Sequence, residues 1–413
     1  MGSRLRLLAP VLRGGLIAVL VGLGGLGCRS CPKEEPAPVP AVPSAGECYP
    51  PVETTVAESL ATSLAVLSQA PPACPHPLQA LCLSGGVAGA PFSAGVLVGW
   101  TESGTRPVFD EVCGISSGSL LGAFAFLGSK YDAKLQSLIL TLGNSDLFKF
   151  RPLRCMLQHG AFGSAEPAER LLRKVYDEEF LTDLRQAHAE GRRFFVGTMN
   201  MQTKQLVTWD VGAIASSGRP DADELVRKVL LAAVSWPGGF PPVQFDVEIN
   251  GHCYHELHAD AGSASMAFVR FGALPGWPAP GTSPRPGWLA GSDLYVLASR
   301  KLYCDPEPVS KHAVCRIMLS VSAIFEALTR ADIARLYCFC AVSGMRFHML
   351  ALPEDYHGEP PSFKCLYPRG ARQLYEIGHR MGASGHCWRH RPPGALPGEE
   401  AVPRDASLIR GCH

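Results

Sequence analysis

The residue of this chain best suited to act as a nucleophile is a serine in a glycine-rich pentapeptide. The pentapeptide Gly-Ile-Ser-Ser-Gly places Ser116 between Gly114 and Gly118. A strand-like run at 108–113 precedes it, and a helix-like apolar run at 119–127 follows it. A serine on such a tight strand-to-helix turn exposes its hydroxyl at the helix N-terminus, a geometry that suits attack on an ester carbonyl. We therefore expect Ser116 to be a catalytic nucleophile, with the two glycines forming the elbow around it.

A second glycine-rich segment lies upstream. Ser84, Gly85 and Gly86 follow one strand-like run and precede a helix-like run. Backbone N–H groups at such a turn can bind the oxyanion of an acyl-transfer intermediate, so we expect an oxyanion hole at Gly85, Gly86 and Val87. Far downstream, Asp260 stands on a turn of small residues and is a candidate for the catalytic base.

Together these motifs resemble the patatin-like phospholipase family, which combines a glycine-rich oxyanion loop, a Gly-x-Ser-x-Gly elbow and a late Asp-Gly motif. The resemblance covers most of residues 78–390 and includes the segments 83–97 and 232–243. It implies a phospholipase A-type carboxylic ester hydrolase in which Asp260 acts directly as the base on Ser116. It requires neither a histidine nor a cofactor. The partners it implies are a lipid ester substrate and a membrane surface, and the oligomeric state stays open.

Two positions depart from the pattern of the family. Val87 stands where a third glycine is usual, and Ala261 stands where glycine normally follows the aspartate. The Cβ of valine disfavours a positive φ, so a left-handed conformation there would distort the oxyanion loop. The alternative reading is a catalytically impaired lipid-binding protein of the cell envelope.

A serine–aspartate–histidine triad is a further alternative. The order Ser116, Asp210, His258 is the chain order of α/β-hydrolases, although Asp210 fits a structural residue of a central strand. His258 also ends a stretch rich in potential metal ligands, residues 252–258, whose spacing matches no zinc motif. We interpret that stretch as a polar strand or loop at the site entrance. We interpret a C-terminal group as a surface loop without metal: His379, His386, Cys387 and His390.

The N-terminus has the pattern of an export signal. Basic residues Arg4, Arg6 and Arg13 precede an apolar stretch at 16–26, which is short for a membrane span. Cys28 follows small residues in a pattern that resembles a bacterial lipoprotein cleavage site. We expect an exported protein, lipidated at Cys28 and anchored in the cell envelope.

Four segments follow from this organisation. They are a signal segment at 1–28, a Pro/Ala-rich tether and lead-in at 29–76, a hydrolase domain at 77–390 and a disordered tail at 391–413. The chain has 38 Lys and Arg against 37 Asp and Glu, so no basic excess points to nucleic acid. Its 15 cysteines are compatible with disulfides or with free buried thiols, and the sequence does not decide between them.

The fold class follows from the alternation of strand-like and helix-like runs along the chain. Such alternation predicts an α/β protein, and the resemblance makes it a three-layer α/β/α sandwich. We expect strands at 78–83, 108–115, 193–198, 205–210, 293–298 and 347–352. We expect helices at 56–67, 92–100, 117–127, 131–142, 165–177, 222–234, 310–342 and 370–381.

Overall fold

The computed structural model describes residues 76–150, 161, 163–271, 287–303, 309, 313–357 and 370–394. The signal segment, the tether with its expected helix and nearly all of the expected tail lie outside these residues. Cys28 lies outside them too. The export and lipidation of the chain, and the boundaries of its segments, therefore stay predictions.

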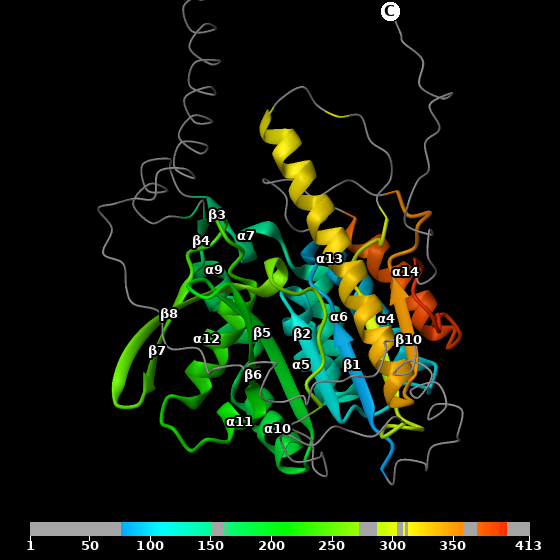
Figure 1. The fold of residues 1–413 in the computed structure, drawn as a ribbon, viewed down its shortest axis with the longest axis horizontal. Coiled ribbons are helices and arrows are strands. Elements are labelled where there is room, and N and C mark those ends of the chain that lie inside the picture. The colour runs from blue at the N-terminus through cyan, green and yellow to red at the C-terminus, as the bar shows by residue number, and fades with distance from the viewer. Residues whose placement is uncertain are drawn as a thin grey trace, which may run out of the picture.

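A mixed sheet forms the centre of the molecule (Figure 1). Five of its strands run parallel in the order β10, β9, β1, β2 and β5. Their carboxyl ends therefore share one edge of the sheet, where ligands of open α/β sheets usually bind. The bounds are β1 (Gln79–Leu83), β2 (Glu111–Ile115), β5 (Arg193–Asn200), β9 (Asp293–Ala298) and β10 (Arg346–Ala351).

Antiparallel strands extend the sheet beyond β5. They are β6 (Gln205–Asp210), β7 (Val243–Ile249) and β8 (His252–Asp260), of which β6 and β8 pair with β5, and β7 pairs with β8. A separate two-stranded ladder joins β3 (Lys149–Phe150) to β4 (Gly163–Ser164).

Helices cover both faces of the sheet. The longer ones are α4 (Ala90–Glu102), α5 (Ser117–Leu127), α6 (Asp132–Thr141), α9 (Glu166–Val175), α10 (Glu178–Ala189), α12 (Ala222–Val234), α13 (Ala313–Ser343) and α14 (Ala371–Ala383). Short ones are α7 (Asn144–Leu147), α11 (Val211–Ala215) and the 3₁₀ turns η1 (Val87–Gly89), η2 (Ser129–Tyr131) and η3 (Ala261–Ser263). No helix within the described ranges combines the length and apolarity needed to cross a bilayer.

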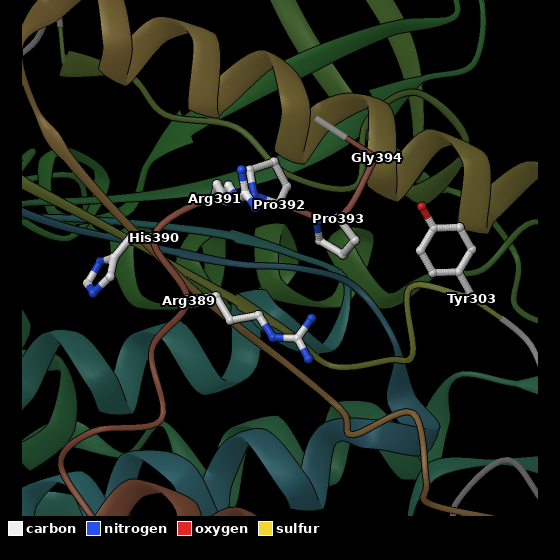
Figure 2. A pocket seen from close by; sticks show the side chains of 7 residues that line it. All are labelled: Tyr303, Arg389, His390, Arg391, Pro392, Pro393 and Gly394. Carbon is white, nitrogen blue, oxygen red and sulfur yellow. The ribbon is translucent and has the colours of Figure 1, made fainter. Parts of the chain in front are cut away.

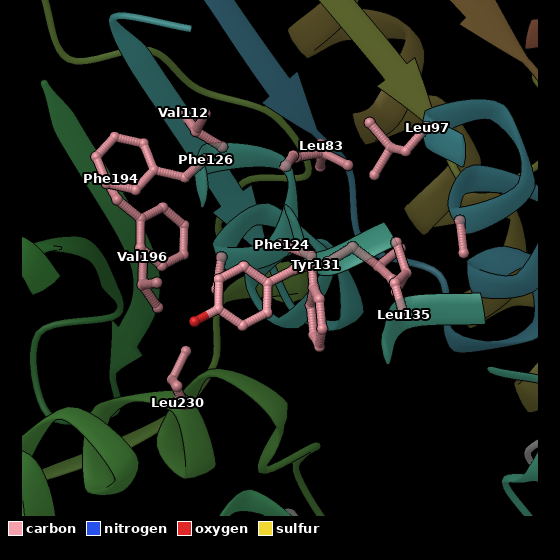
Figure 3. Packing of buried hydrophobic residues seen from close by; sticks show 14 of the residues in the cluster. Leu83, Leu97, Val112, Phe124, Phe126, Tyr131, Leu135, Phe194, Val196 and Leu230 are labelled. Atoms are coloured by element: carbon pink, nitrogen blue, oxygen red, sulfur yellow. The ribbon is translucent and has the colours of Figure 1, made fainter. Parts of the chain in front are cut away.

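Strand alternation gives the sheet two apolar cores. Leu81 and Leu83 of β1 point to one face and Ala80 and Cys82 to the other, because successive side chains of a strand alternate. The first face packs under α4, α5, α10, α12 and α14, and Figure 3 shows its centre around Phe124, Tyr131 and Phe194. The second face packs under α13. The expected α/β/α sandwich is confirmed.

Two glycine pairs let α4 and α14 pack with their backbones in close contact. A Cβ at Gly95 would lie 2.1 Å from the carbonyl oxygen of Tyr375, and one at Gly99 would lie 2.1 Å from that of His379. Gly378 and Gly382 face the carbonyl oxygens of Phe92 and Val96 in the same way, at 2.0 and 2.3 Å. A side chain at any of these four glycines would collide with a main chain.

The expected strands and the expected helices from 92–100 onward all appear, with shifts of a few residues at their ends. Sequence reasoning missed α10 and β7, and it anticipated β8 only as a polar strand or loop. α10 begins with a clear signal, because the Asp177 side chain accepts a hydrogen bond from the Phe180 N–H at 3.0 Å. Among the described cysteines, Cys82, Cys113, Cys253, Cys338, Cys340 and Cys387 are free thiols.

Candidate active site

The sheet register brings Ser116 and Asp260 together. β6 pairs with β5 from Phe195 to Asn200 and occupies one edge of that strand. β2 pairs with the other edge up to Ile115, which lies opposite Gly197. β8 must take that same edge next, since its Asp260 lies opposite Thr198. The residue after β2 and the last residue of β8 are thus neighbours at the carboxyl edge of the sheet.

Ser116 forms a sharp turn between β2 and α5. Its φ of 54° and ψ of −128° put a non-glycine residue in the left-handed half of conformational space, at a cost of roughly 1–3 kcal/mol. Both flanking glycines are sterically required. A Cβ at Gly114 would lie 2.5 Å from the Gly118 carbonyl oxygen, and one at Gly118 would lie 2.4 Å from that of Leu83. The Ser116 side chain stays partly exposed at the N-terminus of α5.

The carboxyl group of Asp260 is buried beside this turn, with 7% of the residue exposed. Its Oδ1 accepts a hydrogen bond from the Gly262 N–H at 2.8 Å. Burial raises the pKa of Asp260 to about 6, while the neighbouring Ser116 side chain and the Gly262 N–H act in the opposite direction. A carboxylate with a raised pKa beside a serine hydroxyl is equipped to accept a proton near neutral pH.

The glycine-rich loop lies against Ser116. A Cβ at Gly85 would be 3.1 Å from the Ser116 Cβ, so a side chain there would crowd the serine. The positive φ of the loop falls on Gly86, at 140°, and Val87 begins η1 without a left-handed conformation. The substitution of valine for glycine therefore strains nothing here. The N–H groups of Gly85, Gly86 and Val87 donate to no acceptor in the part of the chain that the structure describes.

Two serines fix this loop. The Ser84 hydroxyl donates to the Gly85 carbonyl at 3.1 Å and accepts from the Ser299 N–H at 3.0 Å, just beyond β9. Because a trans peptide points its C=O and N–H in opposite directions, holding the Gly85 carbonyl also orients the Gly86 N–H. Ser299 is fixed in turn by a 2.7 Å hydrogen bond between its hydroxyl and that of Ser93 in α4.

The turn after Asp260 is held by apolar contacts to the sheet and by the buried carboxylate of Asp332 in α13. Ala261 is fully buried in a small cluster that includes Ile115 of β2, so its methyl group fills space that glycine would leave. Asp332 of α13 accepts hydrogen bonds from the Ser265 hydroxyl at 3.0 Å and from the Met266 N–H at 2.7 Å. Sequence reasoning missed these residues, because only the fold brings α13 to this turn.

Met266 links the loop and the turn. A Cβ at Gly85 would lie 3.3 Å from the Met266 Cε, and one at Gly262 would lie 3.4 Å from its sulfur. The side chain is 4% exposed and therefore belongs to the packed wall of the site. Methionine is well suited to such an irregular gap because it is unbranched and flexible.

The three residues of the alternative triad lie in separate interactions. His258 is fully buried, with Nδ1 2.8 Å from the Thr198 hydroxyl and Nε2 3.1 Å from Glu256. Burial lowers its pKa. Asp210 instead accepts a hydrogen bond from the Ala213 N–H at the start of α11. Among the described residues, no hydrogen bond or ion pair joins His258 to Ser116 or to Asp210. Both imidazole nitrogens already have partners, so neither is free to serve as a base.

The histidine-rich stretch is strand β8, as the interpretation of a polar strand anticipated. Alternation along β8 sends His255 outward, where its Nδ1 lies 2.6 Å from Asp246 of β7. Within the described ranges, no group of three or more His, Cys, Asp or Glu side chains is arranged to hold a metal ion. The C-terminal histidines are likewise apart, with His379 next to Glu102 and His390 next to the Phe347 carbonyl.

The protein is an α/β/α sandwich whose sheet is parallel at its centre, with a serine on a strained strand-to-helix turn. Residues 81–270 match the model of the patatin-like phospholipase family, so this part of the chain is a patatin-like phospholipase domain. The structure is similar to the crystal structure of VipD from Legionella pneumophila, at 11% identity, with 78% of this chain and 70% of VipD covered and a TM-score of 0.36. No curated protein matches the chain.

Proposed function

We propose that this protein is a serine lipid acyl hydrolase that cleaves carboxylic esters of phospholipids or related lipids. The family supports lipid acyl hydrolysis in general. The observation that carries the finer proposal is the sheet register, in which Ser116 and the buried Asp260 carboxyl are neighbours at the carboxyl edge of the sheet. Asp260 is the proposed base and Ser116 the proposed nucleophile.

In the proposed reaction, the Ser116 oxygen attacks the ester carbonyl and its proton moves to the Asp260 carboxylate. The negative charge then develops on the carbonyl oxygen, where the free N–H groups of Gly85, Gly86 and Val87 are available to stabilise it. Collapse of the intermediate expels the alcohol, which takes the proton from Asp260 and leaves an acyl-serine. A water molecule activated by Asp260 then releases the fatty acid and restores the serine.

The two departures from the family pattern are compatible with activity. Val87 supplies an N–H from the first residue of a 3₁₀ turn without a positive φ. Ala261 is buried without a positive φ and leaves the Gly262 N–H free to bind Asp260. Neither substitution removes a hydrogen-bond donor that the proposed reaction uses.

The test is fatty-acid release from a water-soluble ester and from phospholipid vesicles by the wild type, Ser116→Ala, Asp260→Asn and His258→Gln. The proposal expects the first two variants to lose at least roughly a thousandfold in kcat/KM with the soluble ester. His258→Gln should keep most of that activity. Equal loss in His258→Gln and Ser116→Ala would instead favour a triad, and a wild type that binds lipid without turnover would favour the pseudoenzyme.

We also propose that the protein is exported and anchored through Cys28. The support is the sequence alone, a basic start followed by an apolar stretch at 16–26 and a cysteine after small residues. Metabolic labelling with a fatty acid, compared between the wild type and Cys28→Ser, tests it. Equal labelling of both proteins would refute lipidation at this residue.

A further inference from the structure

One half of α13 stands apart from the body of the molecule. Its C-terminal end lies at the amino edge of the sheet, where the Leu289 N–H before β9 donates to the Ser343 carbonyl at 2.8 Å. At Arg330 the helix has reached the opposite edge, since Nη1 of Arg330 donates at 2.7 Å to the carbonyl of Leu302, past the end of β9. Residues 313–328 therefore continue beyond the carboxyl edge by about 24 Å at about 1.5 Å per residue. Figure 1 shows this yellow half projecting from the body.

We call residues 313–328 the α13 tip. None of its described side chains from Arg316 to Leu328 is buried, whereas buried positions recur from Thr329 onward. Its exposed side chains are nevertheless strongly apolar, with Ile317 51%, Leu319 36% and Ile324 62% exposed. Ile317 and Ile324 are seven residues apart and therefore share one face of the helix. Exposed apolar side chains on one helix face mark an interaction site, because leaving them in water is unfavourable.

Cationic groups lie at the base of the tip. The Arg330 guanidinium stands 4.8 Å from the centre of the Tyr303 ring. Tyr303 in turn lines a cavity of about 520 Å³ with Arg389, Arg391 and four further residues, none of them acidic. Figure 2 shows the Arg389 side chain extending below Pro393, on the side toward Tyr303. Arg389 and Arg391 are both exposed, and no carboxylate pairs with either among the described residues.

We propose that the α13 tip and the arginine cavity at its base dock the protein on a lipid surface that carries anionic phosphate headgroups. The apolar side chains enter the interfacial region of the bilayer, and the arginines meet the phosphates. This charge complementarity selects an anionic bilayer over an uncharged apolar partner. The inference rests on the proposed function, because it explains how the edge of the sheet that holds Ser116 and Asp260 is presented to a substrate embedded in a membrane.

The experiment measures partition of the full chain onto vesicles of phosphatidylcholine alone and of phosphatidylcholine with phosphatidylglycerol. Every arm carries Ser116→Ala, so that no lipid is consumed, and Cys28→Ser, so that no lipid anchor contributes. The tip variant is Ile317→Gln with Ile324→Gln, and the cavity variant is Arg389→Gln with Arg391→Gln. Glutamine keeps a good helix propensity. The matched control is Val342→Gln, which changes a 56% exposed apolar residue at the other end of the same helix.

We expect the tip variant to lose at least about tenfold in partition on both vesicle types, since each isoleucine contributes apolar burial. The cavity variant should lose affinity only on vesicles with phosphatidylglycerol, and the loss should shrink at high salt. Val342→Gln should bind like the parent. A tip variant that binds like the parent, or a control that is weakened equally, overturns the proposal. A tip variant that turns a dimer into a monomer with vesicle binding intact assigns the tip to a second copy instead.

A local readout excludes the N-terminal segment as the source of binding. Tryptophan emission of Ile317→Trp should shift to the blue on vesicles, and that of Val342→Trp should not. If residues 1–28 carry all the binding, neither signal will shift and the proposal fails. Turnover of a water-soluble ester by the same variants with Ser116 restored should match the wild type, and it separates the two ideas. If the wild type does not turn over the soluble ester, the proposed hydrolase function is refuted. Vesicle binding by the Ser116→Ala proteins does not depend on turnover and tests the docking proposal alone.

Discussion

Replacing Asp260 by asparagine should abolish ester hydrolysis and stabilise the fold at neutral pH. Burial raises the pKa of this carboxyl from 3.8 to about 6 in the folded protein. The folded state thus holds the proton more tightly than the unfolded state, so stability is lost as pH rises from about 4 to about 6. At pH 7.5 the ionised carboxylate costs about 3 kcal/mol, from about 1.4 kcal/mol per pKa unit. Asparagine removes this cost, and its Oδ1 still accepts from the Gly262 N–H.

Urea unfolding of wild type and Asp260→Asn at pH 3.5 and at pH 7.5 measures the effect. The variant should be more stable by about 2–3 kcal/mol at pH 7.5 and nearly equal at pH 3.5, because the carboxyl is then protonated in both states. Asp246→Asn, at an exposed carboxyl with a lowered pKa, is the control and should show no such gain. An asparagine variant that is no more stable at pH 7.5, or that retains turnover, would refute the reasoning.

If Asp260 is the base, its pKa should set the pH profile of the wild type. The kcat/KM for a soluble ester should then rise tenfold per pH unit below about pH 6 and level off above it, and a plateau reached only near pH 8 would contradict Asp260 as base. Glu111→Gln should stabilise the fold by up to about 3 kcal/mol at pH 8 but not at pH 4, because burial raises the pKa of Glu111 to about 7. Its Oε2 also has no hydrogen-bond partner in the described structure. Equal unfolding midpoints of the variant and the wild type at pH 8 would contradict this prediction. Ser84→Ala should lower kcat by roughly one to two orders of magnitude with little change in KM, because the Gly85 peptide loses its anchor, and an unchanged kcat would count against an oxyanion role of the loop. Gly378→Ala should destabilise the protein by about 3 kcal/mol or more in a thermal melt, since its Cβ would lie 2.0 Å from the Phe92 carbonyl oxygen. The control Gly143→Ala has no contact closer than 3.3 Å and should not destabilise the protein.

Local sequence signals predicted much of the architecture, because strands and helices with strong apolar patterns are specified largely by their own residues. The strand 205–210 and the helices 117–127 and 222–234 have the bounds expected from the sequence. β7 was missed, and β8 was anticipated only as a polar strand or loop, because their polar, outward-facing residues weaken the period of two. The hairpin depends instead on tertiary pairing with β5, which lies more than forty residues upstream.

The sequence predicted the candidate site residues themselves, but it did not predict the residues that hold them in place. Ser116, Gly85 and Asp260 were identified from motifs, and the structure brings them together. The concern over Val87 was misplaced for a physical reason, since the left-handed position of the loop is one residue earlier, at Gly86. Asp332 had no local signal, because it acts through hydrogen bonds to residues 65 or more positions away.

The contact between α4 and α14 has a consequence for which part of the chain can exist alone. The family match ends at residue 270, yet α4 inside it is complete only with α14 at 371–383 against its glycines. β1 likewise forms its ladder with β9, which also lies beyond the match. A fragment that ends at residue 270 would expose the face of α4 that packs against α14 and leave one edge of β1 unpaired. We expect such a fragment to aggregate when expressed. The smallest part of the chain that folds independently therefore reaches from β1 at least to α14.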